Sequence, residues 1–82
     1  MVGLMTTITV RFQENQSYDP SLDCEVAQFM ATTSSGTFWT RVEVEGPKTL
    51  RDARKAFKEL AVQCIQRGAN PSYLELDENV TH

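Results

Sequence analysis

Histidine, cysteine, glycine and proline are scarce in this chain, and each shortage excludes a class of protein. The 82 residues include one histidine, two cysteines, four glycines and three prolines. So little glycine and proline excludes a collagen-like or low-complexity chain. No apolar run approaches the roughly 20 residues of a membrane-spanning helix. We therefore expect one α+β domain over 1–82 with no membrane segment, an ordered core over 5–77, and frayed ends at 1–4 and 78–82.

The same shortages leave little material for catalysis or metal binding. The single histidine, His82, is the last residue, where no catalytic triad could hold it rigidly. Cys24 and Cys64 lie 40 residues apart, which matches no metal or redox motif. Paired acidic residues such as Glu43 and Glu45 are typical of the solvated side of a strand. We therefore expect no enzyme activity, no cofactor and no metal.

The beginning of the chain shows no targeting signal. Residues 1–7 have neither a basic stretch nor a long apolar stretch. We therefore interpret both cysteines as reduced thiols and expect a cytoplasmic protein, in the host cytoplasm if a phage encodes it.

Alternating apolar and polar residues predict three strands in the first half of the chain. The first covers residues 6–12, and the polar residues 13–23 after it are interpreted as a long connection. A second strand covers 24–33, although its alternation is poor and leaves open which of its faces is buried; a hairpin turn follows at 34–36, and a third strand covers 37–45. The residues expected on the inner side are Ile8, Val10, Phe12, Phe38, Thr40, Val42 and Val44.

The clearest periodicity in the sequence predicts one helix that ends near Arg67. Thr49 is its expected N-cap, with Asp52 completing a capping box, and Gly68 suits the position after the last turn. Its apolar stripe consists of Leu50, Ala53, Phe57, Leu60, Ala61, Cys64 and Ile65.

A short fourth strand is expected over 72–77, with Leu74 and Leu76 pointing inward. The order β-β-β-α-β predicts a two-layer sandwich, with a largely antiparallel four-stranded sheet and one helix on one face. The second face of the sheet then stays in solvent. The residues expected on it are Thr7, Thr9, Arg11, Trp39, Arg41, Glu43, Tyr73 and Glu75.

Trp39 gives this open face a possible function. Leaving an indole in water forgoes about 25 cal/mol per Å² of burial, and Trp, Tyr and Arg are enriched in binding hot spots. Either the indole folds over neighbouring strand residues or under the 13–23 connection, or it belongs to a partner-binding surface. The residues of that surface would be Trp39, Arg41, Glu43, Tyr73 and Glu75.

Charge is segregated along the chain, whose net charge is −3. Residues 1–46 contain two basic and six acidic residues, 47–67 six basic and two acidic, and 68–82 three acidic and no basic residues. The net acidic balance disfavours sequence-independent binding of nucleic acid. Four cations share one flank of the predicted helix, either as a solvated face or as a small anion-binding stripe: Arg51, Arg54, Lys55 and Lys58.

Two segments resemble known families. Gly68 to Leu76, with Gly-x-x-Pro-x-Tyr followed by alternating apolar residues, resembles small phage-encoded anti-CRISPR proteins of the type I-F class. Gly46 to Ala53 resembles the helix entry of HicB-type antitoxins, although the Pro-Asp-x-Pro-Gly segment expected before it is missing. Both resemblances imply a small non-enzymatic protein that disables a larger machine by occupying one of its surfaces.

These observations favour an inhibitor from a phage or mobile element that blocks a host nucleoprotein or nuclease. Its acidic segments would mimic nucleic acid against a basic groove. One alternative is a nucleic-acid-binding accessory domain that uses the four helix cations, with Trp39 stacking on a base. Another is a structural or antitoxin-like homodimer that pairs its open faces or an edge strand.

Overall fold

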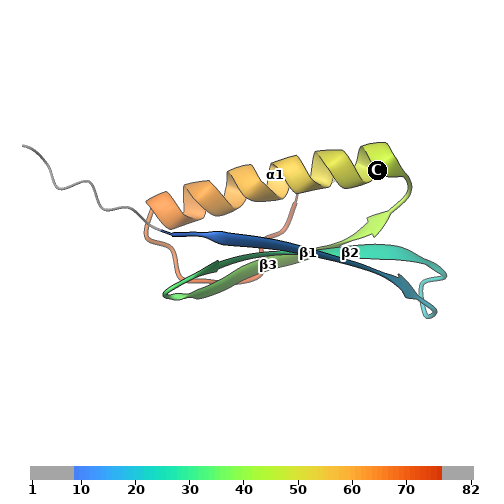
Figure 1. Ribbon diagram of the computed structural model, residues 1–82, viewed down its shortest axis with the longest axis horizontal. Coiled ribbons are helices and arrows are strands. Elements are labelled where there is room, and N and C mark those ends of the chain that lie inside the picture. The colour runs from blue at the N-terminus through green and yellow to red at the C-terminus, as the bar shows by residue number, and fades with distance from the viewer. Residues whose placement is uncertain (1–8, 77–82) are drawn as a thin grey trace, which may run out of the picture.

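The computed structural model describes residues 9–76, which form a three-stranded antiparallel sheet with one helix on one face (Figure 1). The strands β1 (Arg11–Asp19), β2 (Cys24–Thr33) and β3 (Gly36–Val44) lie in the order β1-β2-β3, and α1 spans Pro47–Gln66. The α+β class and the single helix on one face are thus confirmed. The predictions for residues 1–8 and 77–82, including Thr7 and Ile8 of the first strand, lie outside the described residues.

The first strand lies later in the sequence than predicted. Residues 13–19, expected to be part of a connection, belong to β1, which pairs with β2 from Arg11 opposite Thr32 to Asp19 opposite Cys24. Most of β1 is exposed, because α1 packs against β2 and β3 and leaves this edge strand uncovered. A strand without a buried face needs no apolar alternation, so the pattern that predicts strands is missing here.

The second and third strands form over the residues predicted for them, within one residue at each end. β2 covers the predicted residues, and β3 is displaced by one residue at each end. At the start of β3, Gly36 has a φ of 136°, a conformation that side chains rarely adopt. An added Cβ would also lie 3.1 Å from the ring of Pro71, so a larger residue here would have to displace this ring by a few tenths of an ångström in addition to the strained φ.

The core lies between α1 and the inner faces of β2 and β3. Phe29 and Phe57 stack across this interface with ring centroids 5.8 Å apart. The helical stripe is confirmed, since its members are buried or pack at the margin of the core. The core residues are Ala27, Phe29, Ala31, Phe38, Val42, Ala53, Phe57, Ala61, Cys64 and Leu74.

The start of α1 differs from the prediction. The helix begins at Pro47, preceded by Gly46 as N-cap, and no side chain caps it. Thr49 and Asp52 therefore lie inside the helix, and the predicted capping box is wrong. Proline suits the first helical position because its fixed φ matches the helix and its missing N–H would have had no partner there.

The end of α1 agrees with the prediction. Gly68 has a φ of 73°, and its N–H donates to the carbonyl of Ile65 at 3.1 Å. The N–H of Ala69 donates to the carbonyl of Cys64 at 3.0 Å. These two bonds form a Schellman motif, which satisfies carbonyls that the last turn leaves free.

The predicted fourth strand is reduced to a single bridge between Trp39 and Tyr73, parallel to β3. The N–H of Trp39 donates to the carbonyl of Ser72 at 3.2 Å, and the N–H of Leu74 donates to the carbonyl of Trp39 at 2.8 Å. Leu74 is buried and Leu76 packs against the core, as predicted. However, residues 71–76 follow the edge of β3 without a regular ladder, so the four-stranded sheet is not present among the described residues.

Candidate protein-binding surface

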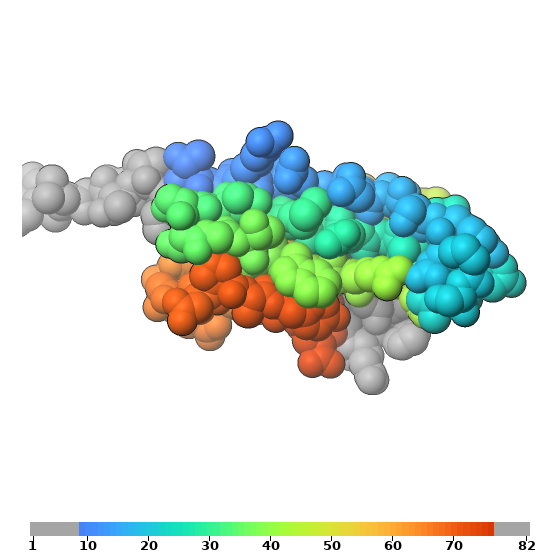
Figure 2. Space-filling model, turned by 90° about the horizontal axis from the view of Figure 1, so that it is seen from below, coloured from blue at the N-terminus to red at the C-terminus, as the bar shows by residue number. Residues whose placement is uncertain are grey.

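The predicted anchor residues of β3 lie on the face of the sheet opposite α1, the side from which Figure 2 views the molecule. Side chains alternate between the two faces of a strand. Along β3 the inward residues Phe38, Thr40 and Val42 are buried, whereas Trp39, Arg41 and Glu43 are exposed on the other face. The segment 71–76 lies along the edge of β3 in the same view and contributes Tyr73.

Trp39 and Tyr73 form an aromatic pair on this face. Their ring centroids are 4.8 Å apart and their planes meet at 66°, an edge-to-face arrangement. The two backbone hydrogen bonds around Trp39 fix the position of the Tyr73 backbone beside it. The indole nevertheless remains 39% exposed and the phenol 48% exposed. An edge-to-face pair of this kind is worth about 0.5–1.5 kcal/mol, which holds the two rings in place against each other. A partner would therefore meet two rings that are already ordered.

The surface beside this pair is hollowed, with a cavity volume of about 330 Å³. Val26 lines the hollow and is buried, although its side chain belongs to the solvent-facing side of β2. Leu22, from the turn between β1 and β2, lines the hollow and is 47% exposed. We call the following set the Trp39 surface: Leu22, Val26, Trp39, Arg41, Val42, Glu43 and Tyr73.

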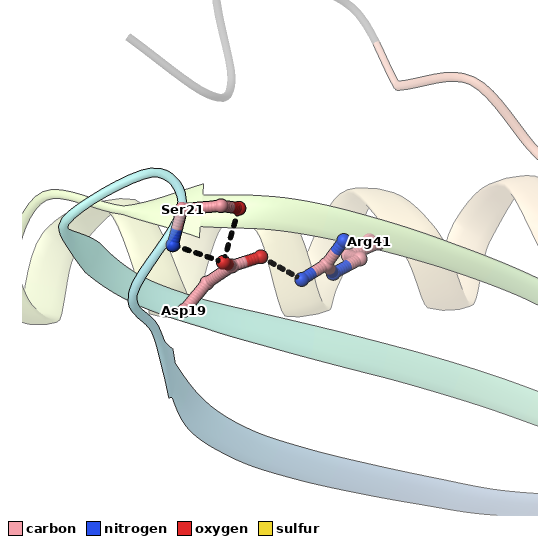
Figure 3. Close-up of polar contacts among 3 residues, drawn as sticks. All are labelled: Asp19, Ser21 and Arg41. Atoms are coloured by element: carbon pink, nitrogen blue, oxygen red, sulfur yellow. Dashed lines mark hydrogen bonds and ion pairs between the residues drawn. The ribbon is translucent and has the colours of Figure 1, made fainter.

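A polar cluster holds the β1–β2 turn against this surface (Figure 3). One carboxylate oxygen of Asp19 accepts hydrogen bonds from the backbone N–H and the hydroxyl of Ser21, at 2.9 and 2.6 Å. The other accepts a hydrogen bond from the guanidinium of Arg41. The bonds from Ser21 and then from Arg41 lower the pKa of Asp19, so its carboxylate is charged at neutral pH. Arg41 is therefore a positioned and largely neutralised side chain.

Glu43 keeps the rim of the Trp39 surface acidic. Its side chain is exposed, and it forms no ion pair with any residue between 9 and 76. Glu75, also predicted for this face, is exposed on the segment after Tyr73. Nearby, desolvation and the carboxylates of Glu43 and Asp19 raise the pKa of Cys24, so this cysteine is held as a thiol rather than a nucleophilic thiolate.

The predicted basic stripe lies elsewhere, on the flank of α1 nearest β1. Arg54 donates two hydrogen bonds to Glu14 of β1, from Nε to Oε1 at 2.6 Å and from Nη2 to Oε2 at 3.0 Å. This contact lowers the pKa of Glu14. Lys58 places its Nζ 5.4 Å from the ring centroid of Phe12. Two of the four cations are therefore already engaged with β1.

Arg51 and Lys55 remain exposed on this flank. They project from the helical layer, whereas Trp39 projects from the opposite face of the sheet. The structure thus separates the two groups that the nucleic-acid hypothesis combines in one site.

Sequence reasoning identified the exposed face of β3 and missed the other contributors. Leu22 and Asp19 belong to the stretch interpreted as a connection, and Val26 belongs to a strand whose buried face the sequence leaves undecided. The signal that could have found them lies in the residues around Asp19-Pro20, which also fit a hairpin turn. The contact between Trp39 and Tyr73 comes from tertiary structure and has no local signal.

The described residues form neither a metal site nor a membrane span. Between residues 9 and 76, no three His, Cys, Asp or Glu side chains form a group that could hold a metal ion. No helix of the described part of the chain is long and apolar enough to cross a membrane. In comparisons with protein families, curated proteins and solved structures, nothing matches this chain.

Proposed function

We propose that this chain is a small binding protein that captures a protein partner on the Trp39 surface. The observation that supports this most directly is the ordered and partly exposed Trp39–Tyr73 pair beside an apolar hollow. A monomer gains nothing from leaving an indole 39% exposed. A partner side chain that fills the hollow between Leu22, Trp39 and Tyr73 would bury all three.

The composition of this surface resembles that of binding hot spots. Trp, Tyr and Arg dominate such sites, and truncation of a hot-spot residue costs about 2 kcal/mol or more. That energy corresponds to roughly a 30-fold loss of affinity. Arg41 is held by Asp19, so it can stack or donate without first losing much side-chain entropy.

Charge indicates the chemistry of the partner. Glu43 offers a carboxylate at the rim that no residue between 9 and 76 pairs with, and the whole chain carries a net charge of −3. A basic partner surface complements this charge and speeds the encounter. We therefore propose that the target is the basic nucleic-acid-binding surface of a nucleoprotein or nuclease, which the chain inhibits by occupying it without catalysing a reaction. The resemblance of Gly68–Leu76 to anti-CRISPR proteins supports the same class of target.

The proposal is tested by partner capture with matched variants. The tagged chain is used to isolate its partner, and the affinity of the purified pair is measured for the parent, Trp39→Ala and Tyr73→Ala. Each variant should bind about 30-fold more weakly. Val62→Ser serves as the control, because Val62 is an equally exposed apolar residue on α1, 40% exposed and far from the hollow. Affinities unchanged in both aromatic variants would show that the partner binds elsewhere.

A second measurement tests the class of target. Nucleic acid that binds the isolated partner should compete with the parent chain for it, and Glu43→Lys should lower the association rate. Simultaneous binding of the chain and the nucleic acid would refute the inhibition mechanism while leaving the binding surface intact.

A further inference from the structure

The outer edge of β1 is an unprotected strand edge. β1 is the outermost strand of the sheet, and within residues 9–76 no segment pairs with its outer side. It runs for nine residues in continuous register with β2, and it contains no proline, lysine or bulge. Proline, lysine and bulges are among the devices that usually prevent edge strands from pairing with other chains. Another such device, charged side chains, is present at Arg11, Glu14 and Asp19, but Glu14 and Asp19 are already paired with Arg54 and Arg41. A strand of this length and regularity is suited to pairing.

The order of residues along β1 is complementary to itself. In an antiparallel pair, side chains directly opposite each other lie on the same face and interact. If two copies of β1 pair about a twofold axis through Asn15, unlike residues meet at each of the remaining positions. Arg11 lies opposite Asp19 of the second copy, Phe12 opposite Tyr18, Gln13 opposite Ser17 and Glu14 opposite Gln16.

The exposed aromatic residues of β1 support this arrangement. Phe12 and Tyr18 lie opposite Ala31 and Glu25 of β2, which places both on the helix-facing side of the sheet. There they are 37% and 53% exposed, because α1 packs mainly over β2 and β3 and reaches β1 through side chains such as Lys58, whose Nζ lies 5.4 Å from the Phe12 ring centroid. Pairing would place each ring beside the other ring of the second copy and cover apolar surface that this chain leaves in water.

From these observations we propose that the chain forms a twofold homodimer through antiparallel pairing of β1 with β1, centred on Asn15. Neighbouring registers are worse. Moving the axis to Glu14 would place two glutamates directly opposite each other. Moving it to Gln16 would leave Arg11 and Phe12 beyond the end of the opposing strand. An axis that passes between two residues would place residues from different faces of the sheet opposite each other, which a twofold antiparallel pair does not permit.

The dimer has a six-stranded antiparallel sheet with both helices on one face. Most of the Trp39 surface lies on β3 and the segment 71–76, and its other two residues, Leu22 and Val26, come from the β1–β2 turn and from β2 rather than from the outer edge of β1. Dimerisation therefore leaves this surface open, and each dimer carries two copies of it. For the same reason, the two proposals can fail separately.

Sedimentation velocity and light scattering test the association. The mass should rise from the 9.3 kDa of the monomer toward twice that value as the concentration increases through about 10 µM to 1 mM, the range expected for a small interface. Asn15→Lys should weaken the dimer by about tenfold, because two ammonium groups would face each other at the axis. Trp39→Ala should dimerise as the parent does. A parent that remains monomeric throughout this range would overturn the proposal.

Disulfide trapping tests the register. Cα atoms directly opposite in an antiparallel pair are about 4.5–5.5 Å apart, within the range that a disulfide bridges. Asn15→Cys should therefore give a covalent dimer under mild oxidation. Gln13→Cys is the matched control on the same face, since its counterpart would lie about 14 Å away along the strand. The parent controls for Cys24 and Cys64. Equal trapping of both variants, or trapping of Gln13→Cys alone, would contradict the proposed register.

Discussion

Replacing Thr40 with valine should stabilise the protein. Thr40 lies on the inner face of β3 between Phe38 and Val42, opposite Phe29 of β2, and is fully buried. Its hydroxyl has no hydrogen-bond partner within the described part of the chain. A buried hydroxyl without a partner costs about 1–3 kcal/mol. Valine keeps the shape and removes the hydroxyl, so we expect Thr40→Val to raise the free energy of unfolding by about 1–2 kcal/mol.

The gain can be measured by urea denaturation and thermal melting, followed by circular dichroism. In a domain of this size, 1 kcal/mol shifts the melting temperature by roughly 4–8 °C. Thr37→Val is the matched control on the same strand, because the Thr37 hydroxyl is 3.1 Å from that of Thr32 and would lose this hydrogen bond. The control should show no gain.

Thr40→Ala supplies the opposite comparison. It removes the hydroxyl together with a methyl group, so it leaves a small cavity and should destabilise the protein. If Thr40→Val destabilised the protein as much as Thr40→Ala does, the hydroxyl would have to be hydrogen-bonded in solution, and the reasoning from its isolation would be refuted.

Two further predictions concern the helix and its contact with β1. Gly68→Ala should destabilise the protein by about 1 kcal/mol, because the φ of 73° is costly for alanine even though a Cβ at this position meets nothing within 4 Å. The control is Gly46→Ser, since Gly46 is an N-cap with an extended backbone and equal room for a side chain. In the same melting assay this variant should not destabilise the protein. The second concerns Glu14, whose pKa its bond to Arg54 lowers from the ordinary 4.5. A carboxyl whose pKa is lower in the folded state than in the unfolded state stabilises the folded state at a pH above its unfolded pKa. This stabilisation is lost as the pH falls through the pKa of the folded state. The parent should therefore lose more stability than Glu14→Gln when melted at pH values falling from about 5 to 3, and equal losses would contradict this role of the ion pair.

The parts of the fold that could be predicted are those that burial controls. The spacing of Ala53, Phe57, Ala61 and Cys64 follows one helical face because that face must meet the sheet. β3 alternates because one of its sides packs under α1 and the other meets water. The prediction failed for β1, since its residues from Gln13 onward line no buried face and therefore show no apolar alternation.

In the candidate site, too, the part that burial controls could be predicted from the sequence and the rest could not. The alternation along β3 is enough to predict that Trp39, Arg41 and Glu43 share one exposed face. The partners of these residues could not be predicted, because they depend on tertiary contacts that leave no periodic pattern. Tyr73 reaches Trp39 through a single bridge, and Asp19 reaches Arg41 of β3 from the last position of β1.

Both proposed surfaces have one physical cause. A single helix can cover about two strands, and α1 covers β2 and β3. β1, the remaining strand, keeps its outer edge and two exposed aromatic rings, Phe12 and Tyr18. The face of the sheet opposite α1 keeps the Trp39 surface. If the β1 edge pairs as proposed, two Trp39 surfaces become linked in one rigid sheet. A target with repeated basic surfaces would then be bound with higher apparent affinity than a single surface, without any new contact. The limited cover that one helix gives the sheet leaves apolar surface of the monomer exposed. In the dimer, the same exposed surfaces would strengthen binding to such a target.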